Sequence, residues 1–179
     1  MKDRKLLNYE LGRISAQEYG TVPPSGVAVV LDNIRSAYNT GSVFRTADAF
    51  HADRMLLCGF TPLPPSAEIH KSALGAEFSV PWEHVDDTMD AVRKLREEGY
   101  TVISVEQTEH SVSLEGFVPE SGHKYALIFG SEVGGVAQEV VDASDLTLEI
   151  PQEGTKHSLN ISVSAGVVLW HFTLNRLRK

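Results

Sequence analysis

The sequence from residue 146 to residue 170 reads Leu146-Thr-Leu-Glu-Ile-Pro-Gln-Glu-Gly-Thr-Lys-His-Ser-Leu-Asn160-Ile-Ser-Val-Ser-Ala-Gly-Val-Val-Leu-Trp170. Its first apolar run is typical of a buried strand and ends at Pro151, which has no N–H to donate to a neighbouring strand. A polar loop follows, and then a long apolar helical pattern begins. A strand, a loop and a helix N-terminus in succession leave backbone N–H groups free. This stretch therefore predicts a ligand-binding unit.

The bulk properties indicate an ordinary globular protein. The chain has 179 residues and a formal net charge of −8. This length favours one domain with a buried core. The charged N-terminus is followed by no apolar segment of the secretory type. The most apolar stretch, 161–174, is shorter than a bilayer span. We therefore expect a cytoplasmic protein without a membrane span.

Cys58 is the only cysteine, which excludes an internal disulfide and a cysteine-based zinc cluster. Its apolar neighbours indicate a buried thiol rather than a nucleophile, and we expect no metal site. The acidic charge argues against general coating of nucleic acid but leaves room for a focused basic patch. Basic residues gather at both ends of the chain: Lys2, Arg4, Lys5 and Arg13, and Arg176, Arg178 and Lys179. The second group could equally complement the dipole of a C-terminal helix.

Apolar runs alternate with helical patterns along the chain. We predict strands at 27–31, 55–60, 77–81, 101–105, 125–129 and 146–150. We predict helices at 3–19, 42–50, 67–74, 86–98 and 136–141, the first of them forming an N-terminal helical extension over residues 1–20. Continuous apolar strands separated by helices are typical of an α/β fold with a mostly parallel sheet flanked by helices.

Three polar loops, at 32–41, 130–135 and 152–160, follow predicted strands. Ligands of such sheets bind beyond the carboxyl ends of the strands, so we expect these loops to converge. The glycine-rich nucleotide fingerprints are absent from the sequence. Ser131 does not lie in the G-x-S-x-G pattern of a hydrolase. Phosphate-binding and serine-hydrolase chemistry are therefore not indicated.

Together the loops carry a family resemblance. The segments are Asn39-Thr-Gly-Ser-Val-Phe-Arg45-Thr-Ala-Asp-Ala-Phe, Phe129-Gly-Ser-Glu132-Val-Gly-Gly, and Ile150-Pro-Gln-Glu-Gly154-Thr-Lys-His-Ser158-Leu-Asn160-Ile-Ser-Val-Ser-Ala. In order and rough spacing they resemble the three motifs of the SpoU/TrmH family of SPOUT RNA methyltransferases. The resemblance covers about residues 27–175.

The resemblance implies an α/β fold with a C-terminal deep trefoil knot. It implies a single SPOUT domain over residues 1–179, in which residues 125–175 form the knot and cofactor region. It also implies S-adenosyl-L-methionine as methyl donor and a ribose 2′-hydroxyl of RNA, in tRNA or rRNA, as acceptor. A homodimer with active sites at the subunit interface is expected as well.

The same resemblance assigns site residues. The candidate catalytic residues are Arg45, Asn39, Glu132, Ser158 and Asn160. The candidate cofactor-binding residues are Phe129, Gly130, Ser131, Ile150, Gln152, Ser158 and Leu159, and the backbone around Gly130, Ile150 and Leu159 is expected to hold the cofactor. Gln152 stands where the family commonly has Met. Two alternatives stay open: Ser158 and Asn160 as helix caps, and Glu132 as a solvated loop carboxylate.

Arg45 is the candidate with the most direct chemical role. A guanidinium stays protonated in proteins, so proton abstraction by Arg45 is chemically unfavourable. Our hypothesis is that Arg45 binds the RNA phosphate and stabilises developing alkoxide charge. The alternative is an ion pair with Asp48, one turn further along the helix.

The C-terminal helical pattern has two faces. Ser158, Ser162 and Gly166 form a stripe of small residues that would let another backbone approach closely. A broad apolar face contains Leu159, Val163, Val167, Trp170 and Leu174. We expect the sheet and a partner subunit to cover both faces, and the alternative is an ordinary core helix in a monomer.

Two other functions remain possible at this point. One is a catalytically degenerate member of the family that binds RNA or assists ribosome assembly. The other is an unrelated α/β enzyme with a nucleotide cofactor, against which the missing glycine-rich fingerprint argues.

Overall fold

The computed structural model describes residues 3–177 and contains one parallel sheet of seven strands, in the order β3-β2-β1-β6-β4-β7-β5. The strands are β1 (Val27–Asp32), β2 (Arg54–Cys58), β3 (Trp82–Val85), β4 (Tyr100–Val105), β5 (Val112–Ser113), β6 (Lys124–Phe129) and β7 (Leu146–Glu149). The predicted α/β class with a parallel sheet is confirmed.

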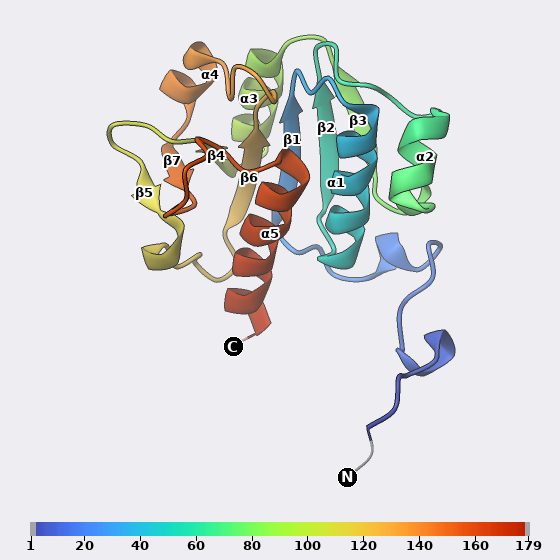
Figure 1. The fold of residues 1–179 in the computed structure, drawn as a ribbon. Helices are drawn as coiled ribbons and strands as arrows, with labels where there is room; N and C mark the ends of the chain where they lie inside the picture. Colours follow the sequence, from blue (N-terminus) through green and yellow to red (C-terminus); the bar gives the residue numbers. More distant parts are fainter. Residues whose placement is uncertain (1–2, 178–179) are drawn as a thin grey trace.

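Helices cover both faces of the sheet (Figure 1). They are α1 (Ala37–Ala49), α2 (Ala67–Ala73), α3 (Thr88–Glu97), α4 (Gln138–Ala143) and α5 (Ile161–Leu177). Alternate residues of β1 face opposite sides: Val29 packs with side chains of α1, α2 and α5, and Val30 packs with those of α3 and α4. Burial on both faces explains why the strands read as continuous apolar runs.

Several predicted boundaries are wrong. Helix α1 begins five residues before the predicted residue 42, because Ser36 caps it by accepting a hydrogen bond from the Asn39 backbone N–H. Asn39 therefore lies in the first turn of a helix rather than in a loop. The predicted strand 77–81 is instead the 3-10 helix Ala76–Phe78, and the edge strand begins at Trp82.

The predicted N-terminal helix over residues 3–19 is also wrong. The described part of this segment holds two short 3-10 helices, Asn8–Glu10 and Tyr19–Thr21, and runs away from the sheet (Figure 1). Its apolar side chains Leu6, Leu7 and Ile14 are exposed. An amphipathic segment without a surface to pack on gains too little to hold an isolated helix. Of the basic residues noted at the chain ends, Lys2, Arg178 and Lys179 lie outside the described residues.

Two other expectations concern burial and membranes. Cys58 is buried at the end of β2, and burial raises the pKa of its thiol to about 12, which leaves no thiolate for chemistry near neutral pH. Within residues 3–177, no helix has the length and apolarity needed to cross a bilayer.

Gly41 is required where α1 crosses α2. A Cβ atom at this position would lie 2.1 Å from Ser72 Oγ and 2.4 Å from the Ile69 carbonyl oxygen. We expect Gly41→Ala to lower the free energy of unfolding by about 1–3 kcal/mol, because overpacking outweighs the better helix propensity of Ala. Chemical denaturation measures this change.

Gly116→Ala is the matched control, since nothing lies within 4 Å of a Cβ there. It should change the free energy of unfolding by less than about 0.5 kcal/mol. Equal stability of the Gly41→Ala protein and the parent would contradict this packing.

Candidate functional site

A cavity of about 630 Å³ opens at the carboxyl edge of the sheet. Its walls are the loops that follow β4, β6 and β7, together with the start of α5. The strand order brings these three strands together, and their loops leave the same edge of the sheet. Its volume lies in the range of ordinary small-ligand sites.

All seven predicted cofactor-binding residues line this cavity: Phe129, Gly130, Ser131, Ile150, Gln152, Ser158 and Leu159. Glu132 and Asn160 line it as well. Asn39 and Arg45 are not part of its wall and lie on α1. The structure thus brings two of the three predicted segments into one cavity and places the third beside them.

The loop after β6 is a tight turn that requires glycine. Ser131 and Gly135 exchange two backbone hydrogen bonds, of 3.0 and 2.9 Å. A Cβ on Gly130 would lie 2.0 Å from both Gly135 C and Val136 N. The close return of the backbone at this point shapes one wall of the cavity and excludes any larger residue.

The loop from Pro151 to Asn160 forms the outer wall, and all ten of its residues are exposed. The side-chain amide of Gln107, in the loop after β4, donates a hydrogen bond of 2.8 Å to the carbonyl of His157. Ser158, Leu159 and Asn160 precede α5, so the expected four-residue stripe does not begin within the helix. Asn160 caps α5: its Oδ1 accepts from the backbone N–H of Ser162 at 2.9 Å.

The three predicted segments meet at Glu132. Its carboxylate accepts hydrogen bonds from Asn39 Nδ2 at 2.9 Å and from the backbone N–H groups of Arg35 and Ser36 at 3.1 and 3.4 Å. Asn160 Nδ2 in turn donates to Asn39 Oδ1 at 3.3 Å. Glu132 is thus more than a solvated carboxylate, because it ties the second segment to the N-terminus of α1.

The ionisation of Glu132 reflects these contacts. Partial burial by itself raises the pKa of its carboxyl group, but hydrogen bonds from the Asn39 side chain and from the backbone of Glu132, Arg35 and Ser36 outweigh burial. The net effect lowers the pKa below its ordinary value, so Glu132 is an anion at neutral pH. Its charge also lies favourably near the N-terminus of α1.

Arg45 is exposed on α1, nearly two turns beyond Asn39. Within the described residues, no ion pair joins Arg45 to Asp48, so the alternative structural role is not supported. Partial burial raises the pKa of Asp48, and the smaller opposing effects come from His51, Arg13 and Ser79, not from Arg45. Because Arg45 is exposed and forms no ion pair with Asp48, its guanidinium can bind an external anion.

Several polar residues of the cavity are not predicted from the sequence, among them Glu106, Gln107 and Glu149. Glu106 accepts a hydrogen bond of 3.0 Å from the Val136 backbone N–H. Glu149 accepts one of 2.8 Å from Ser111 Oγ. Glu106 and Gln107 directly follow a strand, so the carboxyl-end rule could have identified them. Glu149 lies within a strand and carried no such signal.

The lining of the cavity fits a cationic, phosphate-free ligand. Carboxylates of Glu106, Glu132 and Glu149 line it, whereas none of its lining residues is Lys or Arg. Acidic side chains complement a sulfonium or ammonium group, and Ile150 and Leu159 offer an apolar surface to an adenine ring. These residues suit S-adenosyl-L-methionine better than a nucleotide with phosphates.

Comparison with known proteins agrees with this geometry. Residues 26–170 match the model of the SpoU rRNA Methylase family. The 23S rRNA (guanosine-2'-O-)-methyltransferase of Nitrosomonas europaea is 33% identical over 146 residues, which are 79% of this chain and 54% of that protein. The chain therefore spans only about half the length of this curated relative.

Two solved structures are similar in fold. An AdoMet-bound rRNA methyltransferase from Sinorhizobium meliloti matches with a TM-score of 0.76 and 28% identity, over 84% of this chain and 59% of that chain. A structure described as giving insights into the 2-OH methylation of C/U34 on tRNA matches with a TM-score of 0.76 and 25% identity. That match covers 86% of this chain and 97% of the other.

Because the folded-state pKa of Glu132 is lowered, its stabilising contribution is present above the unfolded-state value near 4.5 and is lost as the pH falls below it. We expect Glu132→Gln to reduce the free energy of unfolding at pH 7 by no more than about 1 kcal/mol, since the group is partly exposed. The difference from the parent should shrink between pH 5 and pH 3. Urea denaturation across this range tests both statements.

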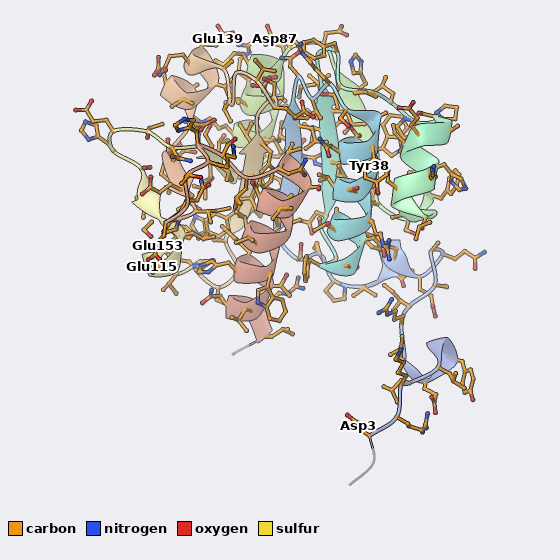
Figure 2. All side chains as sticks on the ribbon, in the orientation of Figure 1. Asp3, Tyr38, Asp87, Glu115, Glu139 and Glu153 are labelled. Atoms are coloured by element: carbon orange, nitrogen blue, oxygen red, sulfur yellow. The ribbon has the colours of Figure 1, made fainter. Side chains whose placement is uncertain are left out.

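Glu153→Gln serves as the control, because Glu153 is an exposed glutamate in the loop from Pro151 to Asn160 (Figure 2). It should leave stability unchanged at both ends of the pH range. A Glu132→Gln deficit that grows as the pH falls would contradict the assignment.

Proposed function

The chain belongs to the SpoU rRNA methylase family, and we propose that it is an S-adenosyl-L-methionine-dependent methyltransferase that modifies a ribose 2′-hydroxyl in tRNA or rRNA. One observation carries the proposal: Glu132 and Asn160, both in the cavity wall, are hydrogen-bonded to Asn39 on the helix that bears Arg45. A cofactor-sized cavity and an exposed arginine thus lie on one connected framework.

The cofactor site consists of the cavity described above. The backbone of Gly130, Ile150 and Leu159 would hold the adenosyl part, with Phe129, Ser131, Gln152 and Ser158 around it. Gln152 offers an amide where a Met is common in the family, and its exposed position lets the amide point to solvent or ligand. The carboxylates of the wall would favour the positively charged donor over its neutral-sulfur product.

Bound S-adenosyl-L-methionine supplies a methyl group on a positively charged sulfur. In the transfer, the ribose O2′ forms a bond to the methyl carbon while the carbon–sulfur bond breaks, and the hydroxyl proton leaves to solvent. The protein must then align O2′ and lower the energy of its developing negative charge. Arg45 would bind the adjacent phosphate and stabilise that charge, and Asn39 and Asn160 would orient the ribose.

An active methyltransferase accounts for the site better than a catalytically degenerate RNA-binding or ribosome-assembly protein does. All five candidate catalytic residues lie in the segments that resemble the family motifs, and Glu132, Asn39 and Asn160 form a hydrogen-bonded set. A protein that only binds RNA has no need for an acidic cofactor cavity. We place the enzyme in the cytoplasm, where both RNA classes occur.

We further propose a homodimer and the family's trefoil knot, with the segment from 146 to 160 threaded through a preceding loop. Val163 and Trp170 on α5 are 49% and 48% exposed, and Val167 is also exposed on the same side. The opposite side of α5 packs on the sheet through Ala165, Val168 and Phe172. An apolar helix face left in solvent is a surface suited to a second copy.

Incubation of the protein with labelled S-adenosyl-L-methionine and separate tRNA and rRNA pools tests the activity. We expect label in one pool, and we expect Arg45→Lys to lower turnover by roughly 100-fold, because Lys keeps the charge but loses the planar fork. Arg93→Lys, on the distant helix α3, is the matched control and should keep full activity. Near-normal turnover of Arg45→Lys would contradict the role given to the guanidinium.

Sedimentation equilibrium tests the dimer. We expect twice the chain mass of 19.6 kDa for the parent and a single-chain mass for Val163→Asp, because a carboxylate would be buried without a partner. Val118→Asp, at another exposed valine, should remain dimeric. A monomeric parent would contradict the proposal.

A further inference from the structure

A second cavity, of about 530 Å³, lies between α2 and the start of β3. β3 is one edge of the sheet, and β4, β6 and β7 lie toward the other edge (Figure 1). The first cavity is built around these three strands. The two cavities share no lining residue. The second cavity therefore needs an explanation of its own.

Three of the eight residues that line the second cavity are aromatic: His70, Phe78 and Trp82. Phe78, on the 3-10 helix that follows α2, is 76% exposed. The rings of His70 and Phe78 lie 5.9 Å apart, and Trp82 completes the wall. Flat rings around an open cavity suit a flat ligand, and unpaired nucleic-acid bases stack on such platforms.

A buried carboxylate stands behind these rings. The side chain of Glu77 is only 3% exposed, and its Oε1 lies 2.5 Å from Nδ1 of His70. Its Oε2 has no hydrogen-bond partner in the described part of the chain. Packing alone does not call for a charged group here, since burying one without full pairing is costly.

Glu77 fixes how His70 can act. Nδ1 of His70 is engaged by the Glu77 carboxylate, so Nε2 is the ring nitrogen left to a ligand. The His70 side chain is 63% exposed at the cavity. A free ring nitrogen beside a stacking surface can form a hydrogen bond with the polar edge of a base.

The surroundings connect this cavity to the proposed RNA-methylating site. Helix α2 packs against α1, which carries Asn39 and Arg45, and the exposed Tyr38 projects from α1 (Figure 2). Lys71, adjacent to His70, is exposed and can contact a phosphate. A single RNA strand could thus extend from α1 to α2.

We propose that this second cavity binds an unpaired nucleobase of RNA, stacked on Phe78 and hydrogen-bonded through its polar edge to Nε2 of His70. The base lies at a contact separate from the methylated nucleotide. The cavity would add affinity for single-stranded substrate that the acidic cofactor cavity cannot supply.

Trp82 provides a direct readout, because the chain has two tryptophans and Trp170→Phe leaves Trp82 alone. In the full chain with this substitution, titration with a cytidine hexamer RNA should quench Trp82 fluorescence saturably. We expect Phe78→Ala to weaken binding about 5- to 100-fold, the usual range for loss of one stacking platform. Phe78→Tyr should retain it, and His70→Ala should weaken it several-fold.

Val118→Ala is the control, because Val118 is similarly exposed and lies outside both cavities. The proposal is overturned if Trp82 does not respond to the hexamer, or if Phe78→Ala binds as tightly as its parent. It is also overturned if free cytidine monophosphate binds as tightly as the hexamer, or if only a proline-rich peptide quenches Trp82. Tight binding of free cytidine monophosphate would indicate a free-nucleotide site, and quenching by the peptide alone would indicate a protein-docking site.

Thermal stabilisation by S-adenosylhomocysteine separates this proposal from the methyltransferase activity. We expect Phe78→Ala to keep that stabilisation while it loses RNA affinity. If the parent showed no stabilisation but Trp82 still reported RNA binding, the methyltransferase proposal would fail and the base site would stand.

Discussion

The carboxylate of Glu132 connects parts of the chain that are distant in sequence. It accepts hydrogen bonds from the backbone of Arg35 and Ser36 and from the side chain of Asn39, more than ninety residues earlier. Asn39 is bonded in turn to Asn160, which caps α5. The geometry of the site depends on this junction, because it fixes the N-terminus of α1 relative to both loops of the cofactor cavity.

The junction is possible because of the order of the strands. β6 lies between β1 and β4, so the loop that carries Glu132 leaves the sheet beside the end of β1. β7 pairs with the other side of β4, which places the loop from 151 to 160 across the cavity. Gly130 lets the loop after β6 fold back on itself without steric conflict. The strand order and Gly130 together place the acidic side chains that line the cavity.

Much of this arrangement could be predicted from the sequence. Apolar runs such as 27–31 and 125–129 identified the buried strands, and the seven residues that the family resemblance named for the cofactor all line one cavity. The cap at Ser36 could not be read from hydrophobic periodicity, so the predicted start of α1 was late. The predicted N-terminal helix is wrong for the opposite reason: the helical pattern exists, but Leu6, Leu7 and Ile14 stay exposed and pack on no surface within residues 3–177. The contacts of Glu106 and Gln107, and the His70–Glu77 pair, depend on the tertiary fold and on side-chain positions that periodicity does not encode.

The chemical identity of the methylated atom tests the central claim most directly. RNA labelled by the protein would be digested to nucleosides, and the position of the labelled methyl group determined by mass spectrometry. The roles proposed for Arg45, Asn39 and Asn160 predict label only in 2′-O-methylated ribose, at a defined nucleotide. Label on a base, or scattered over many nucleotides, would contradict the account.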